Sequence, residues 1–190
     1  MHVERQGNQL RVHAQADIEA DRATIWSTLS DYDHLAQFIP NMSSSRTISR
    51  DGPNALVEQK GSAGVGPFRR SFTALFEVME RLNESISISA RAGDFSRFDA
   101  RYEILPLATG CSRVVYDATI VPRISAPPLI SDVVMRLMIG DQFDALIDEM
   151  ARRERRTRSA PSRRIEISRA TAQESARPEW IPLEQLRSPL

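Results

Sequence analysis

Cysteine is almost absent from this chain of 190 residues. Cys111 is the only one, so no disulfide can form within the chain and a cysteine-based metal site is not expected. A single cysteine is typical of a reducing compartment, and we therefore expect a cytoplasmic protein. No apolar run reaches the ~18 residues of a membrane-spanning helix, and the first ten residues contain no signal-peptide core.

Motifs for metal, nucleotide and nucleophilic chemistry are also missing. The three histidines are scattered, with no second ligand at a metal-binding spacing. Gly64 and Gly66 precede Pro67 and a predicted strand instead of a helix, so they do not form a phosphate-binding loop. Cys111 has no histidine at a spacing that indicates a nucleophile pair. We therefore expect no metal and no cofactor.

Acidic and basic residues balance over the whole chain but not along it. There are 25 of each, yet residues 151–190 hold ten arginines and only five glutamates. The preceding 150 residues then carry 15 basic and 20 acidic side chains. Because large apolar residues become rare after Met150, we predict a folded domain over 1–158 and a poorly ordered Arg/Ser/Pro-rich tail over 159–190. Such a basic tail can dock on the acidic body or bind a phosphate-rich surface.

Alternation of apolar and polar residues predicts six or seven β-strands. Short turn signals separate them, of which Asp51-Gly52-Pro53-Asn54 is the strongest, so we expect consecutive antiparallel pairing. The candidate segments are 10–18, 42–50, 55–64, 68–82, 85–92, 95–107 and 111–122.

Helical spacing is found in two places. Asp21 stands where an N-cap would, before apolar residues at helical spacing, and a second short helix follows and ends before Pro40. Near the C-terminus, Pro127-Pro128 can open a helix whose apolar stripe continues to Met150. A stripe of that length must be buried, so we expect this helix to lie across the concave face of a curved sheet.

The predicted order is a strand, two short helices, an antiparallel sheet of six to seven strands in all, and one long C-terminal helix. This α+β order resembles the helix-grip fold of the START-like (SRPBCC, Bet v 1-like) superfamily. The stretch I-x-A-x-x-x-x-I-W-x-x-L-S-D-Y-x-x-L-A-x-F-I-P-N-M over 18–42 is similar to the polyketide cyclase/dehydrase family, which includes RatA-type and Coq10-type proteins. Further matches are Glu58-Gln59 and Gly93-Asp94-Phe95, and the resemblance covers about residues 8–150. It implies no fixed set of catalytic residues.

The resemblance implies a mainly apolar cavity between the sheet and the long helix. Aromatic side chains there either line a pocket or fill a core, and alternation alone leaves open which strand residues face inward. The predicted ligand-binding residues are Trp26, Phe38, Arg70, Phe76, Phe98, Arg101, Tyr102, Tyr116, Val134, Met135 and Met138.

Three functions compete on this basis. The first is binding or carriage of a hydrophobic small molecule, such as a lipid, an isoprenoid or quinone, or an aromatic polyketide, and it needs no catalytic set. The second is a polyketide-type cyclase or dehydratase, which requires groups such as Arg70, Glu77, Arg101 or Tyr116 to converge on one pocket. The third, implied by the RatA-type relatives, is association with the ribosome or RNA through the basic tail. The sequence favours the first, a protein that is not an enzyme.

Overall fold

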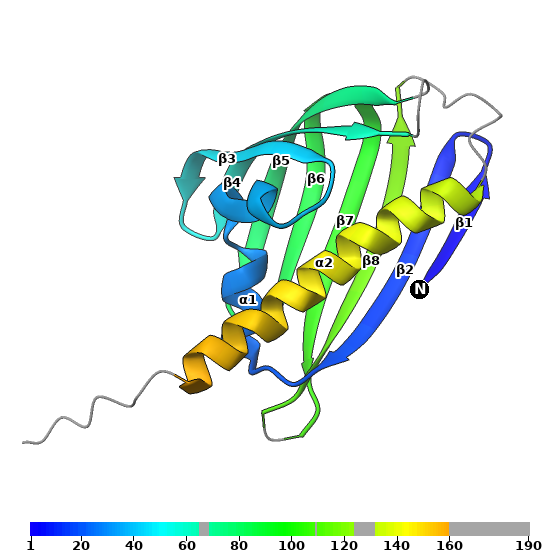
Figure 1. Ribbon diagram of the computed structural model, residues 1–190. Helices are drawn as coiled ribbons and strands as arrows, with labels where there is room; N and C mark the ends of the chain where they lie inside the picture. Colours follow the sequence, from blue (N-terminus) through cyan, green and yellow to red (C-terminus); the bar gives the residue numbers. More distant parts are fainter. Residues whose placement is uncertain (65–68, 109, 124–131, 160–190) are drawn as a thin grey trace, which may run out of the picture. The chain divides into compact units, whose positions relative to one another are not determined.

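The computed structural model describes residues 1–64, 69–108, 110–123 and 132–159, with the backbone alone for 132–135. Within these residues, eight strands form one antiparallel sheet in the order β1-β2-β8-β7-β6-β5-β4-β3 (Figure 1). The strands are β1 (His2–Gln6), β2 (Gln9–Ile18), β3 (Met42–Asp51), β4 (Asn54–Ala63), β5 (Arg70–Arg81), β6 (Ser85–Gly93), β7 (Phe95–Pro106) and β8 (Ser112–Pro122).

The sequence prediction of six to seven strands was one short, because it omitted β1. This strand is an edge strand of five residues in which only Val3 is buried, so it carries almost no hydrophobic signal. It pairs with β2 through a tight turn at Gly7 and Asn8, where Gly7 has a φ of 60°. A Gly-Asn pair between two short extended segments is a hairpin signal, and it was the one local indication of this strand.

Two short helices connect β2 to β3, as the sequence predicted. Helix α1 (Arg22–Leu29) begins at the expected N-cap, where a carboxylate oxygen of Asp21 accepts a hydrogen bond from the Thr24 amide at 2.7 Å. After a break at Ser30, the 3-10 helix η1 (Tyr32–Gln37) follows and buries Tyr32 and Leu35. Helix η1 packs against β3, whereas α1 contacts β7 and α2, and both contribute side chains to the core.

Helix α2 (Asp132–Ser159) crosses the concave face of the sheet (Figure 1). Phe143, Leu146 and Met150 are buried on its inner side at helical spacing, and the helix contacts β1, β2 and α1. The predicted start of this helix at Pro127-Pro128 lies outside the described residues. The tail was predicted over 159–190; Ser159 is the last residue of α2, and 160–190 lie outside the described residues. The hydrophobic core therefore occupies the layer between the sheet and the three helical elements.

Candidate functional site

Polar side chains are concentrated in one transverse row of the concave sheet face. Residues directly opposite each other in an antiparallel ladder point to the same face. The register places Glu80 of β5 opposite Ile86, Ile86 opposite Tyr102 of β7, and Tyr102 opposite Tyr116 of β8. The adjacent row is Val78, Ile88, Ala100 and Ala118. The polar row therefore lies between apolar positions of the same face, with Ile104 and Val114 beyond it on β7 and β8.

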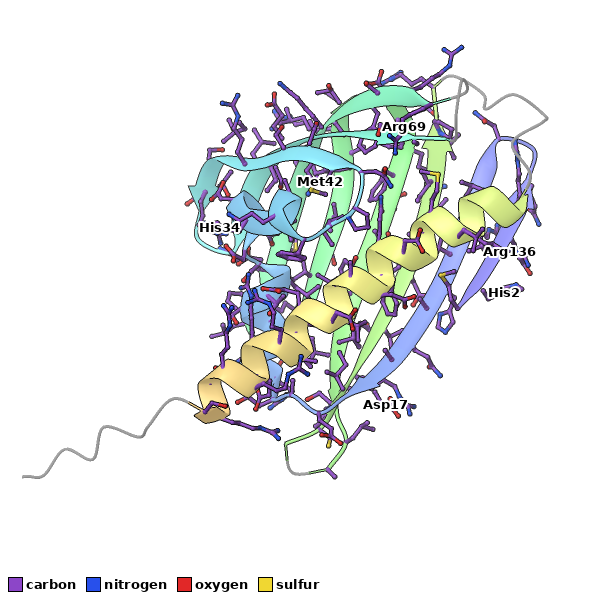
Figure 2. The ribbon with its side chains drawn as sticks, in the orientation of Figure 1. His2, Asp17, His34, Met42, Arg69 and Arg136 are labelled. Carbon is purple, nitrogen blue, oxygen red and sulfur yellow. The ribbon has the colours of Figure 1, made fainter. Side chains whose placement is uncertain are left out.

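A cavity of about 170 Å³ lies between this face and the helices. Its lining is mostly aliphatic and aromatic, and Met42 of β3, labelled in Figure 2, is among the lining residues. No charged side chain of the described residues lines it. The chain contains three tyrosines, and all three line this one cavity. The polar lining residues are Tyr32, Gln59, Tyr102, Tyr116 and Gln142.

Tyr102 and Tyr116 form a stacked pair inside the cavity. Their ring centroids are 4.5 Å apart, and the Phe143 ring of α2 lies 6.4 Å from Tyr116. Within the described part of the chain, neither phenol oxygen has a hydrogen-bond partner. Burial raises the pKa of both phenols above the usual value, so they are neutral near pH 7 and each offers an unused O–H donor.

Tyr32 has the opposite arrangement, because its hydroxyl is already engaged. It donates to Oε1 of Glu80 at 2.8 Å, and Glu80 is only 7% exposed. Arg50 of β3 donates to both carboxylate oxygens at 3.0 and 2.9 Å, and its guanidinium lies over the Tyr32 ring. Burial and the adjacent Glu80 carboxylate together raise the pKa of Tyr32. This cluster gives a buried carboxylate both a cation and a neutral donor.

Two glutamines supply the remaining polar groups of the lining. Gln59 of β4 donates to the Ser45 hydroxyl at 3.4 Å, and Gln142 of α2 donates to the Pro40 carbonyl at 3.5 Å. Both hydrogen bonds are long, so both amides are weakly held and can reorient toward a ligand. Sequence analysis did not select either glutamine as a site residue, although Gln59 stood in one of the family-like motifs.

Residues 18–147 match the family described as polyketide cyclase/dehydrase and lipid transport. The chain belongs to this family. No curated protein sequence matches it.

Solved structures share the helix-grip arrangement of this polyketide cyclase/dehydrase family member. The Zhui aromatase/cyclase from Streptomyces sp. R1128 is 15% identical with a TM-score of 0.65, over 80% of this chain and 98% of that one. A START superfamily protein from Mycobacterium smegmatis is 17% identical with a TM-score of 0.61, over 77% and 98% of the two chains. The protein TTHA0849 from Thermus thermophilus is 18% identical with a TM-score of 0.63, over 78% and 99%. At these identities the likeness establishes the fold alone.

Four of the predicted ligand-binding residues of this family member line the cavity, and they are Phe76, Phe98, Tyr102 and Tyr116. Others lie close by without lining it. Trp26 and Phe38 pack against the core, and the buried indole N–H of Trp26 has no acceptor among the described residues. The Met138 sulfur accepts a hydrogen bond from the Gly64 amide at 3.3 Å. The side chains of Val134 and Met135 lie outside the described residues.

Two predicted site residues do not face the cavity. Arg101 is adjacent to Tyr102 on β7, so alternation directs it to the opposite face, where it pairs with Glu103 at 2.7 Å. Arg70 is the first residue of β5 and is exposed at the end of the sheet. Glu77, which the cyclase hypothesis invoked, is also exposed and pairs with Arg91 at 3.0 Å. Of the four groups named for catalysis, only Tyr116 reaches the cavity.

Besides the two glutamines, sequence analysis missed Tyr32 and its partners Glu80 and Arg50 as site residues. Glu80 had a readable signal, because it continues the inward alternation of Ala74, Phe76 and Val78 along β5. Arg50 lies in a polar strand and gave no such signal. In the described part of the chain, no three His, Cys, Asp or Glu side chains are grouped to hold a metal ion. No helix there is long and apolar enough to cross a membrane.

Proposed function

We propose that this protein binds an aromatic ring that carries a hydrogen-bond acceptor, such as an aromatic ketone or a quinone, in the cavity between the sheet and α2. The observation that carries the proposal is the pair of unpartnered phenols, Tyr102 and Tyr116, in an otherwise apolar lining. Neither phenol oxygen is fully buried, because Trp26 Nε1 is the one fully buried side-chain polar atom without a partner among the described residues. Each O–H is therefore accessible and can donate to an acceptor on a ligand. We propose that the protein carries such a molecule.

The cavity volume supports a ring as the bound group. Cavities of about 150 Å³ bind benzene, whereas drug-sized ligands occupy about 300–1,000 Å³. The 170 Å³ here therefore matches a single substituted ring, or one ring of a larger molecule whose remainder lies outside the cavity. The volume is too small for a whole acyl chain lipid or a multi-ring polyketide. Among the ligands expected from the sequence, the head group of a quinone fits best.

Binding is favoured over catalysis by the ionisation state of the lining. Tyr102 and Tyr116 have raised pKa values because they are buried, so they remain protonated near pH 7 and cannot act as general bases. The described lining contains no carboxylate or histidine to replace them. Cyclisation is the second candidate, because two neutral donors can also stabilise a carbonyl oxygen that becomes negative during ring closure. A structural neighbour is an aromatase/cyclase, which is the reason to test it.

Acetophenone and ethylbenzene form a matched pair of probes, since they share a ring and differ chiefly in one carbonyl oxygen. We expect calorimetry to show that the protein binds acetophenone about fivefold more tightly, the equivalent of one hydrogen bond of about 1 kcal/mol. The double variant Tyr102→Phe/Tyr116→Phe should lose this preference and bind ethylbenzene as before. Failure of both probes to bind, or a preference that survives in the variant, contradicts the proposal. Turnover of a poly-β-ketone substrate that the same variant abolishes would favour the cyclase instead.

Cytoplasmic location, the boundary at 158/159 and binding of the ribosome, RNA or an anionic surface through the basic tail stay predictions. At the end of α2, Arg152, Arg153 and Arg158 form ion pairs with the helix or with Asp31. A truncation should therefore begin at residue 160 and leave these pairs intact. If the truncated protein sediments with ribosomes as the full chain does over a salt series, the tail has no such role.

A further inference from the structure

We propose that Glu80 acts as a positioning residue that fixes the Tyr32 oxygen as a hydrogen-bond acceptor, so that the preferred ligand carries a hydroxyl donor as well as a carbonyl. This inference rests on the proposed function and specifies its ligand class as hydroxyaryl ketones or hydroxyquinones. The two kinds of tyrosine in one cavity would then recognise opposite ends of the same ring.

The direction of the Tyr32 hydrogen bond follows from the partners of Glu80. Arg50 donates to both carboxylate oxygens of Glu80, at 3.0 and 2.9 Å, so both oxygens act as acceptors in this cluster. The Tyr32 hydroxyl must therefore be the donor across the 2.8 Å contact. Because its single proton is donated to Glu80, the Tyr32 oxygen can act only as a hydrogen-bond acceptor toward a ligand.

Tyr102 and Tyr116 offer the complementary group from strands β7 and β8, on the same face of the sheet as Glu80. Glu80 lies two strands from Tyr102 and three from Tyr116 in the same transverse row. At about 4.8 Å per strand, these backbones are roughly 10 and 14 Å apart, and the side chains reach into the space between. The row thus presents an acceptor near β5 and two donors on β7 and β8, with the apolar lining beside it.

The burial of Glu80 is difficult to explain by stability alone. A buried ion pair contributes little or nothing compared with apolar residues of similar size, because both charges lose their hydration. Arg50 keeps 42% of its side chain exposed, whereas the Glu80 side chain keeps only 5%, so the carboxylate bears most of the desolvation. Glu80 and Arg50 instead hold the Tyr32 hydroxyl so that its oxygen is left as an acceptor. An apolar pair at these positions could not do this.

Comparing 4-hydroxyacetophenone with acetophenone tests the inference. We expect the full chain to bind the hydroxylated probe about three- to tenfold more tightly, as for one additional hydrogen bond. Tyr32→Phe removes the acceptor, and Glu80→Gln introduces an amide that can donate to Tyr32 and free its proton. Both variants should abolish the advantage of the hydroxylated probe, so that the ratio of the two affinities falls to about one in each variant. An advantage that persists in both variants, or is absent from the unmodified protein, overturns the inference.

A spectroscopic measurement on the unmodified protein does not depend on how the variants fold. The absorbance of 4-hydroxyacetophenone distinguishes phenol from phenolate, so its pKa can be followed in the bound state. A probe that donates to Tyr32 beside the Glu80 carboxylate should stay neutral, with its pKa raised relative to the free probe. A bound phenolate would show that the site selects an anion, and it would overturn the inference. If acetophenone itself does not bind, the proposed function fails; if it binds but the hydroxyl gains nothing, only this inference fails.

Discussion

Replacing each of the three tyrosines by phenylalanine is predicted to change stability in opposite directions. Tyr102→Phe and Tyr116→Phe each remove an oxygen that has no partner among the described residues, whereas Tyr32→Phe removes the donor that faces Glu80 at 2.8 Å. The chemical change is the same at all three positions, and the three residues line one cavity. Differences among the variants therefore report the hydrogen-bonding state of each hydroxyl.

The magnitudes follow from the surroundings of each group. Burying a hydroxyl without a partner costs about 1–3 kcal/mol in proteins. Neither the Tyr102 nor the Tyr116 oxygen is fully buried, since only Trp26 Nε1 is fully buried and unpartnered among the described residues, so we take the low end, about 1 kcal/mol, for each. For a chain of this size, that raises the Tm of the ligand-free protein by about 2–4 °C per substitution. Tyr32→Phe loses a hydrogen bond to a charged group, worth about 2 kcal/mol, and should lower the Tm by roughly 4–8 °C.

The assay is thermal unfolding followed by circular dichroism, with urea unfolding as the second measurement of the free energy. Near-UV spectra of the variants should retain the native aromatic signature. The reasoning is refuted if the Tyr102 and Tyr116 variants are destabilised as much as the Tyr32 variant. A protein that gains stability when it loses its binding groups would be a case of the trade-off between stability and function.

Three other predictions concern pH and backbone conformation. Burial raises the pKa of all three tyrosines. Their contribution to the free energy of unfolding should therefore be fully present below pH ~10, the pKa of tyrosine in the unfolded chain, and should be lost at higher pH. Absorbance at 295 nm should show phenol ionisation only together with unfolding. Burial opposes ionisation of Asp31 and Glu149, but hydrogen bonds, including those from Arg153, outweigh it and lower both pKa values. The stabilisation that these two carboxylates contribute should be present above pH ~4 and lost as the pH falls. Arg153→Met should flatten this pH dependence of the free energy of unfolding, measured with urea. Gly93→Ala should destabilise the protein clearly more than Gly52→Ala, for which ~1–2 kcal/mol of strain is expected. Both glycines have a positive φ, but only at Gly93 would the new Cβ lie 2.2 Å from a carbonyl oxygen. Equal losses of stability in chemical denaturation would contradict this.

The elements that sequence predicted are those with a strong local pattern. Alternation located seven of the eight strands, and Asp21 marked the start of α1 correctly. The same alternation also excluded one of the predicted site residues. Phe98, Ala100, Tyr102 and Ile104 are apolar and stand at every second position of β7, so Arg101 had to face the other way.

The contacts that could not be predicted join residues far apart in the chain. Tyr32, Arg50 and Glu80 come from η1, β3 and β5, and their meeting depends on the sheet order and on how η1 packs over it. No local period records that arrangement. Likewise, the absence of a partner for Tyr102 and Tyr116 is a property of the packed structure, since only coordinates show which neighbours lie within reach.

The order of the strands has a consequence for synthesis of the chain. From β3 to β8 each strand pairs with its successor, so this part can form hairpin by hairpin as it emerges from the ribosome. Strand β2 is synthesised early but pairs with β8, so Ala14 can pair with Tyr116 only after β8 has been synthesised. The β1–β2 hairpin thus keeps an unpaired edge throughout most of translation, and the slow step of folding is the closure of this long loop. Nascent chains stalled before β8 should bind chaperones that recognise exposed strand edges, and chains stalled after α2 should not.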